Sequence, residues 1–119
     1  MSTQGTISVT NTTKGKVPSL PFELIKSRAL GKKYELSLVF CGDALIKKLN
    51  QTYRNKNKPT NILSFTLSKN SGEIFINLSH LKGFSVGFLF VHGLLHLKGF
   101  DHGVTMEQAE KVLRKKFKI

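Results

Sequence analysis

Residues 85–98, with the sequence SVGFLFVHGLLHLK, constrain the fold of this chain more than any other segment. The segment is apolar nearly all round, which is typical of a helix that is buried on most sides. Gly99 follows directly, in the position of a C-terminal glycine cap. Such a helix needs other elements packed around it, so we expect it at the centre of the fold.

Two strand-then-helix units are expected before this central helix. Residues 6–10 alternate as a strand does, and a helical pattern then runs from a possible N-cap at Ser19 to Gly31. Residues 34–40 alternate in the same way. The next helix is expected to be capped by Asp43 and to direct four residues inward: Leu45, Ile46, Leu49 and Tyr53. This order predicts parallel pairing of the first strands.

A hairpin and a last helix complete the expected fold. Residues 62–67 and 73–77 are predicted strands, and the short link SKNSG permits only an antiparallel hairpin. The last helix is expected to begin at Thr105, paired with Gln108 in a capping box, with an apolar face formed by Met106, Ala109, Val112, Leu113 and Phe117. We therefore predict one α/β (α+β) domain over residues 1–119, with a four-stranded mixed sheet, one antiparallel strand and about four helices.

The charge of the chain restricts its partners. Nineteen lysines and arginines against seven acidic residues give a formal net charge of +12, which favours a polyanion, most commonly nucleic acid. A membrane surface usually requires a basic amphipathic helix or a lipid anchor, and neither stands out. Cys41 is the single cysteine and the N-terminus lacks a secretory signal pattern. We expect a cytoplasmic protein without a membrane partner.

The segment VHGLLHLKGFDH carries the predicted chemistry. His92 and His96 are four residues apart and share one helix face, and Gly99 allows the chain to fold back so that His102 approaches the same point. A histidine taken alone is more often a hydrogen-bonded core residue, but three at this spacing favour a metal. Imidazole ligands suit zinc better than magnesium or calcium, and three ligands leave a fourth position open, as in catalytic sites. We predict one zinc per chain.

The residues around these histidines leave the catalytic base open. The spacing matches the metzincin protease pattern, but Gly93 stands where that pattern requires a glutamate. Asp101 adjoins the ligands, where it would either bond to a ligand imidazole and fix its tautomer or act as a general base; a turn or cap carboxylate is the alternative. Glu110 is assigned to the last helix, with no role at the site.

The segment from His92 to His102 resembles the signature of the YbeY family, H-G-x-L-H-L-x-G-[YF]-D-H, at every fixed position. The segments LNQTYRNKNKPTNILSF and GEIFI resemble two further family segments, so the resemblance extends from about Leu49. The family consists of bacterial metal-dependent endoribonucleases that act in ribosomal RNA maturation and ribosome quality control. The resemblance implies zinc ligation by the three histidines and assigns the family's functionally important arginine to Arg54. It also implies cleavage of single-stranded RNA at the 3′ end of 16S ribosomal RNA, with ribosomal subunits and ribosomal or assembly proteins as partners.

The chain departs from the family pattern at three places. Asn61 stands where aspartate is usual and cannot act as a charged base, and Glu73 replaces another aspartate. The stretch between Asn77 and His92 is shorter than in typical members, which suggests a lost helix beside the site. These departures keep a second hypothesis open, a zinc-binding ribosome assembly factor without catalysis, and a zinc protease is third.

Arg54 would provide positive charge for a phosphate through a bidentate contact. Alternatively, its aliphatic stem covers the core while its head stays in water. Four lysines flank it and would extend a phosphate track, although a run of lysines is also typical of a solvated surface: Lys47, Lys48, Lys56 and Lys58.

Overall fold

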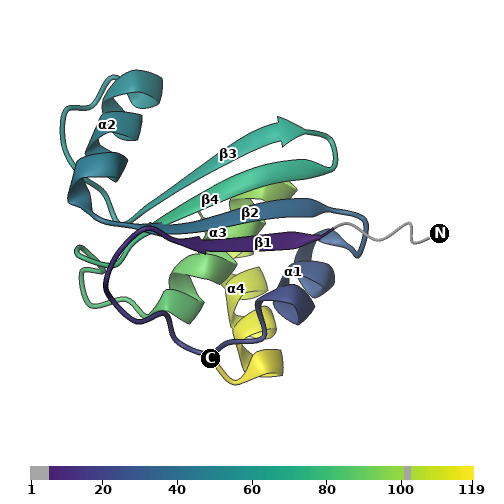
Figure 1. Cartoon of the computed structure of the whole chain (residues 1–119). Coiled ribbons are helices and arrows are strands. Elements are labelled where there is room, and N and C mark those ends of the chain that lie inside the picture. The colour runs from purple at the N-terminus through teal and green to yellow at the C-terminus, as the bar shows by residue number, and fades with distance from the viewer. Residues whose placement is uncertain (1–5, 101–102) are drawn as a thin grey trace.

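A computed structural model describes residues 6–100 and 103–119 of the chain (Figure 1). Within these ranges the chain forms four strands and four helices, in the order β1 (Ile7–Asn11), α1 (Phe22–Leu30), β2 (Glu35–Cys41), α2 (Asp43–Arg54), β3 (Ile62–Ser68), β4 (Ser71–Asn77), α3 (Val86–Lys98) and α4 (Val104–Phe117).

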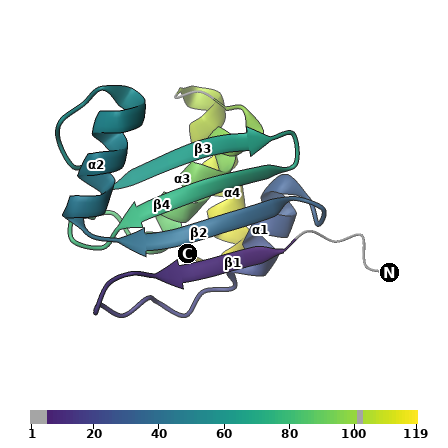
Figure 2. The same cartoon turned by 45° about the horizontal axis from the view of Figure 1, so that its top comes forward.

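The strands form one mixed sheet in the order β1-β2-β4-β3 (Figure 2). β1 pairs parallel with β2, and β2 pairs parallel with β4, with Leu38 opposite both Val9 and Ile74. β3 is an edge strand antiparallel to β4, because only Lys69 and Asn70 separate the two strands and so short a link cannot cross over. The predicted mixed sheet with one antiparallel strand is confirmed.

Three helices cover one face of the sheet, and α2 packs on the opposite face near one end (Figures 1 and 2). α3 lies against the sheet, and eight of its residues are buried: Val86, Gly87, Leu89, Phe90, Val91, Gly93, Leu94 and Leu95. The predicted central helix and its glycine cap, the left-handed Gly99 at φ 109°, are thus confirmed. The structure adds an N-cap at Ser85, whose Oγ accepts from the Phe88 N–H. Among the described residues, no helix has the length and apolar character needed to cross a membrane.

The opposite face of the sheet carries a smaller core beneath α2. Its buried members are Cys41, Ile46, Leu63 and Phe75. Burial, together with the nearby carboxylate of Asp43, raises the pKa of the Cys41 thiol to about 11. The cysteine is therefore an uncharged core residue at neutral pH, and its Sγ lies 3.7 Å from the Ile76 carbonyl oxygen.

Two predicted helix starts are wrong. α1 begins at Phe22 rather than after Ser19, because Pro21 disfavours helical backbone at the residue before it. The cap of α2 is Gly42, and Asp43 is the first residue of the helix. Asp43 Oδ1 instead accepts a hydrogen bond from Asn77 Nδ2 at 2.7 Å.

The predicted inward position of Tyr53 on α2 is also wrong. Tyr53 is 66% exposed, because α2 covers only one end of the sheet and Asn50 is the buried residue in that turn.

The last helix also differs from its prediction. α4 begins at Val104 after the N-cap Gly103, without a side-chain capping bond, so the capping box at Thr105 is wrong. Val112 is 70% exposed rather than part of the apolar face. The buried residues of α4 are Met106, Glu110 and Leu113. An acidic side chain therefore lies on the stripe that the helix turns toward the core.

Candidate metal centre

His92 and His96 lie one turn apart on α3 and face each other. Their Nε2 atoms are 3.1 Å apart, and their rings are nearly perpendicular at 82°. Both side chains are partly buried. The prediction that the two imidazoles share one helix face is confirmed.

The Gly99 turn determines the tautomer of His96. Its left-handed backbone returns the chain over the helix end, where the Phe100 N–H donates to the Leu95 carbonyl oxygen at 3.0 Å. The Phe100 carbonyl oxygen then lies 3.1 Å from His96 Nδ1. Because a carbonyl oxygen can only accept, His96 carries a hydrogen on Nδ1, and a neutral ring therefore has a lone pair on Nε2.

Glu110 has the same effect on His92. Its Oε1 lies 2.7 Å from His92 Nδ1, and its side chain is 9% exposed. An ionised carboxylate accepts from Nδ1–H, which directs the lone pair of His92 to Nε2. The sequence prediction assigned Glu110 no role at the site. The available signal was its spacing from Met106 and Leu113, which places a carboxylate on the buried stripe.

The two histidines fit a metal ion. With both Nδ1 atoms bonded to acceptors, two Nε2 lone pairs converge, an arrangement that a cation between them would stabilise. Two nitrogens bound to one tetrahedral zinc at about 2.05 Å lie about 3.4 Å apart, close to the 3.1 Å seen here. Within residues 6–100 and 103–119 no three potential ligand side chains gather. The predicted third ligand, His102, and the predicted neighbour Asp101 lie outside the described residues.

A cleft of about 380 Å³ opens beside the two histidines, between α3, the end of α2 and the start of β3. Its lining residues are Arg54, Thr60, Asn61, Ile62, Leu63, Ser64, His92 and His96. Arg54 is the last residue of α2, and the left-handed Asn55 ends the helix there. Buried Asn50 holds the following loop in place, since its Nδ2 donates to the Lys58 carbonyl oxygen at 2.8 Å. Arg54 and the histidines therefore line one cleft, although they are far apart in sequence.

Of the remaining residues singled out in the sequence, Asn61 lines the cleft, whereas Glu73 and the four lysines do not. The amide of Asn61 carries no charge there. Glu73 alternates with Ile74 and Ile76, so it lies on the sheet face that points away from α3. The four lysines are exposed on α2 and the loop after it, and the described lining of the cleft includes none of them: Lys47, Lys48, Lys56 and Lys58.

Gly93 is required by close packing between α3 and the sheet. A Cβ atom at this position would lie 3.0 Å from the Cδ1 atoms of Ile62 and Ile74, and 3.1 Å from Ser64 Oγ. The position that carries the glutamate base in metzincin proteases therefore faces the sheet, and a side chain there would require Ile62, Ser64 and Ile74 to shift. This packing excludes a protease mechanism with a base at residue 93.

Replacement of Glu110 tests its contact with His92. We expect Glu110→Ala to weaken zinc binding by about 10- to 100-fold, the usual effect of removing a partner of a metal-binding histidine. Glu110→Gln should lose less, because its amide oxygen still accepts from Nδ1–H. Competition with a chromophoric chelator measures the affinity. Glu107→Ala removes an exposed carboxylate from the same helix and is the control. Equal losses in Glu107→Ala and Glu110→Ala would contradict a specific role.

Comparison with known proteins identifies relatives of this chain. The family model described as Endoribonuclease YbeY matches residues 2–119. The Endoribonuclease YbeY of Pelotomaculum thermopropionicum is 31% identical over 134 aligned residues, covering 95% of this chain and 87% of that protein. That of Ehrlichia canis is 41% identical over 88 residues, covering 61% of this chain and 57% of that protein. The solution structure of TM1509 from Thermotoga maritima shares the fold, with a TM-score of 0.61 at 22% identity over 94% of this chain and 89% of that one. The chain therefore belongs to the Endoribonuclease YbeY family.

Proposed function

We propose that this protein is a zinc-dependent endoribonuclease that cleaves single-stranded RNA in the cleft between Arg54 and the histidine pair. The observation that carries the proposal is the convergence of His92 Nε2 and His96 Nε2 at 3.1 Å beside a cleft that Arg54 also lines. Membership of a family named for endoribonuclease activity supports the same reaction class. His102 is the proposed third ligand.

The protein's own residues have separate parts in this proposal. Zinc, when bound, supplies a Lewis acid and lowers the pKa of a water molecule to about 7. Glu110 and the Phe100 carbonyl oxygen hold the protons of His92 and His96 on Nδ1, which leaves Nε2 for the metal. Arg54 provides two parallel N–H donors for phosphate oxygens and offsets the negative charge that develops during cleavage.

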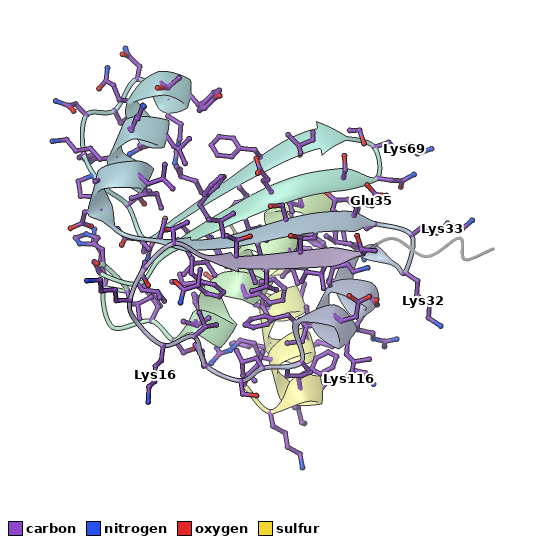
Figure 3. The ribbon with its side chains drawn as sticks, viewed as in Figure 1. Lys16, Lys32, Lys33, Glu35, Lys69 and Lys116 are labelled. Atoms are coloured by element: carbon purple, nitrogen blue, oxygen red, sulfur yellow. The ribbon has the colours of Figure 1, made fainter. Side chains whose placement is uncertain are left out.

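Ribosomal RNA within ribosomal subunits is the proposed substrate, at the 3′ end of the 16S molecule, with ribosomal or assembly proteins as further partners. The net charge of +12 favours a polyanion such as RNA. Figure 3 shows Lys32, Lys33 and Lys69 together at one end of the sheet, and Lys16 and Lys116 at two other places on the molecule. Positive charge spread in this way suits a large RNA surface. RNA maturation, ribosome quality control and a cytoplasmic location follow from the same proposal.

A second candidate is a zinc-binding ribosome assembly factor with little hydrolysis of its own. The observation that favours it is the described lining of the cleft, which contains no carboxylate to act as a base. Asn61 occupies the place where the family usually has aspartate, and its amide cannot accept a proton at neutral pH.

Metal removal separates the two candidates. We expect the purified protein to contain one zinc per chain and to cleave a single-stranded RNA oligonucleotide but not its duplex. A chelator should stop cleavage, and added zinc should restore it, because the proposed reaction depends on a water molecule that the metal activates. Elemental analysis and gel electrophoresis measure the two properties. Zinc content without cleavage, even with ribosomal subunits as substrate, would favour the assembly factor.

A further inference from the structure

A stack of aromatic rings extends from the histidine pair toward the N-terminal end of α3. The rings of Phe88 and His92 are nearly parallel, at 19°, with centroids 6.0 Å apart. The rings of Phe84 and Phe88 are nearly parallel as well, at 15°, with centroids 5.0 Å apart. Three rings spaced four residues apart thus form a continuous stack on one side of the helix, and the spacings put the Phe84 ring within 11 Å of the His92 ring.

Local structure holds this stack in place. Lys82 and Gly83 both have positive φ, at 55° and 81°, and the Phe84 N–H donates to the Leu81 carbonyl oxygen at 3.1 Å. This is the pattern of a type I′ turn, and it sets the position of Phe84 before the helix begins. Farther along the stack, the guanidinium carbon of Arg114 lies 5.0 Å from the centroid of Phe88, and Arg114 Nε donates to the Ile119 carbonyl oxygen at 3.2 Å.

The stack ends at a ring that is open to solvent. Phe84 is 45% exposed, whereas Phe88 is only partly exposed. A hydrophobic residue just before a helix often packs against the first turn and so sets the direction in which the chain enters the helix. This packing explains why one face of the Phe84 ring contacts Phe88. One exposed phenylalanine is ordinary in itself. Here, however, the exposed ring ends a stack that begins at an imidazole of the candidate metal site, with the Arg114 guanidinium over the Phe88 ring and Lys82 two residues before Phe84 in the chain.

We propose that Phe84 is a stacking platform for a nucleobase of single-stranded RNA whose backbone crosses the histidine cleft. This inference rests on the proposed function and adds a substrate contact to it. Aromatic side chains stack with every base, because each base has a π face, and nearby cations bind the backbone. At about 3.4 Å per stacked nucleotide, the Phe84 ring lies about three nucleotides from the histidines. A base inside a duplex is already stacked on both sides, so the platform selects single strands.

Tryptophan at the platform gives a direct readout, since the natural chain contains none. In the zinc-loaded Phe84→Trp variant, we expect binding of an eight-nucleotide oligodeoxyadenylate to quench tryptophan fluorescence. The probe lacks the 2′-hydroxyl of RNA, and gel electrophoresis after the titration checks that it stays intact, so that the measurement reports contact alone. The matched control is Leu24→Trp, at a 63% exposed position of α1, where the same probe should cause little quenching. Equal quenching in both variants, or none in Phe84→Trp at saturating probe, would overturn the proposal.

An affinity series provides a second test. Phe84→Ala and Phe84→Leu should each weaken binding of the oligonucleotide by about 5-fold or more, whereas Phe84→Trp should bind at least as tightly as the natural chain, because base stacking needs an aromatic plane. Circular dichroism checks that each variant folds. If Phe84→Leu binds as tightly as the natural chain, the Phe84 ring does not stack on a base and only packs against the start of α3 or contacts another partner. Zinc-dependent cleavage of RNA by the natural chain would still uphold the proposed function. Absence of nucleic-acid binding by the natural chain would overturn both.

Discussion

His92→Ala and His96→Ala are each expected to reduce zinc content from one per chain to background and to remove metal-dependent RNA cleavage. Each substitution deletes one of two Nε2 atoms that lie 3.1 Å apart, so the remaining imidazole binds metal with fewer ligands. His96→Ala is the cleaner test. His92→Ala also leaves the buried Glu110 carboxylate without its 2.7 Å contact, which destabilises the folded chain by about 1–3 kcal/mol.

Thermal unfolding gives a readout that does not depend on activity. A ligand that binds only the folded state at a hundredfold excess over its Kd stabilises that state by about 2.7 kcal/mol. For a chain of 119 residues this corresponds to a rise of roughly 10 °C in Tm. Zinc should produce this rise in the natural chain but not in His96→Ala. The control is His80→Ala, which removes a histidine between β4 and α3, outside the segment VHGLLHLKGFDH. A full zinc-dependent rise in His96→Ala would show that the metal binds elsewhere.

Arg54→Ala and Arg54→Lys are both expected to lower the rate of RNA cleavage by about 10²-fold, the usual effect of removing a donor to developing negative charge. The guanidinium lines the cleft with the histidines, so its largest contribution is expected in the transition state rather than in substrate binding. Lysine keeps the charge but lacks the planar pair of donors, and so it should rescue poorly. Single-turnover cleavage rates, together with binding constants for the uncleaved oligonucleotide, separate the two effects.

Lys48→Ala is the matched control for Arg54, because it removes an exposed cation from the same helix outside the described lining of the cleft. It should change the cleavage rate little. Zinc content should be unchanged in all three variants. Normal cleavage with weakened binding in Arg54→Ala would instead make Arg54 a phosphate contact without a catalytic part.

The sequence by itself determined those features that depend on residues close together in the chain. The central helix, its Gly99 cap and the shared face of His92 and His96 all follow from helical periodicity and local backbone geometry. The antiparallel β3–β4 pair follows from a link too short for any crossover. In each case the interactions that favour the feature join residues only a few positions apart, so one short stretch of sequence contains all of them.

Only the tertiary structure decided which distant side chains meet. The spacing of Glu110 from Met106 and Leu113 puts it on one stripe of α4, but the side of the helix that contacts α3 decides that this carboxylate meets His92 while Val112 is 70% exposed. Aspartate is a residue type typical of helix N-caps. The packing of α2, however, brings Asn77 to the carboxylate of Asp43. Arg54 reaches the histidine cleft because α2 ends beside the β3 edge of the sheet. These contacts depend on how whole elements pack, and the packing of an element reflects the total apolar area that it buries rather than the preference of any one residue.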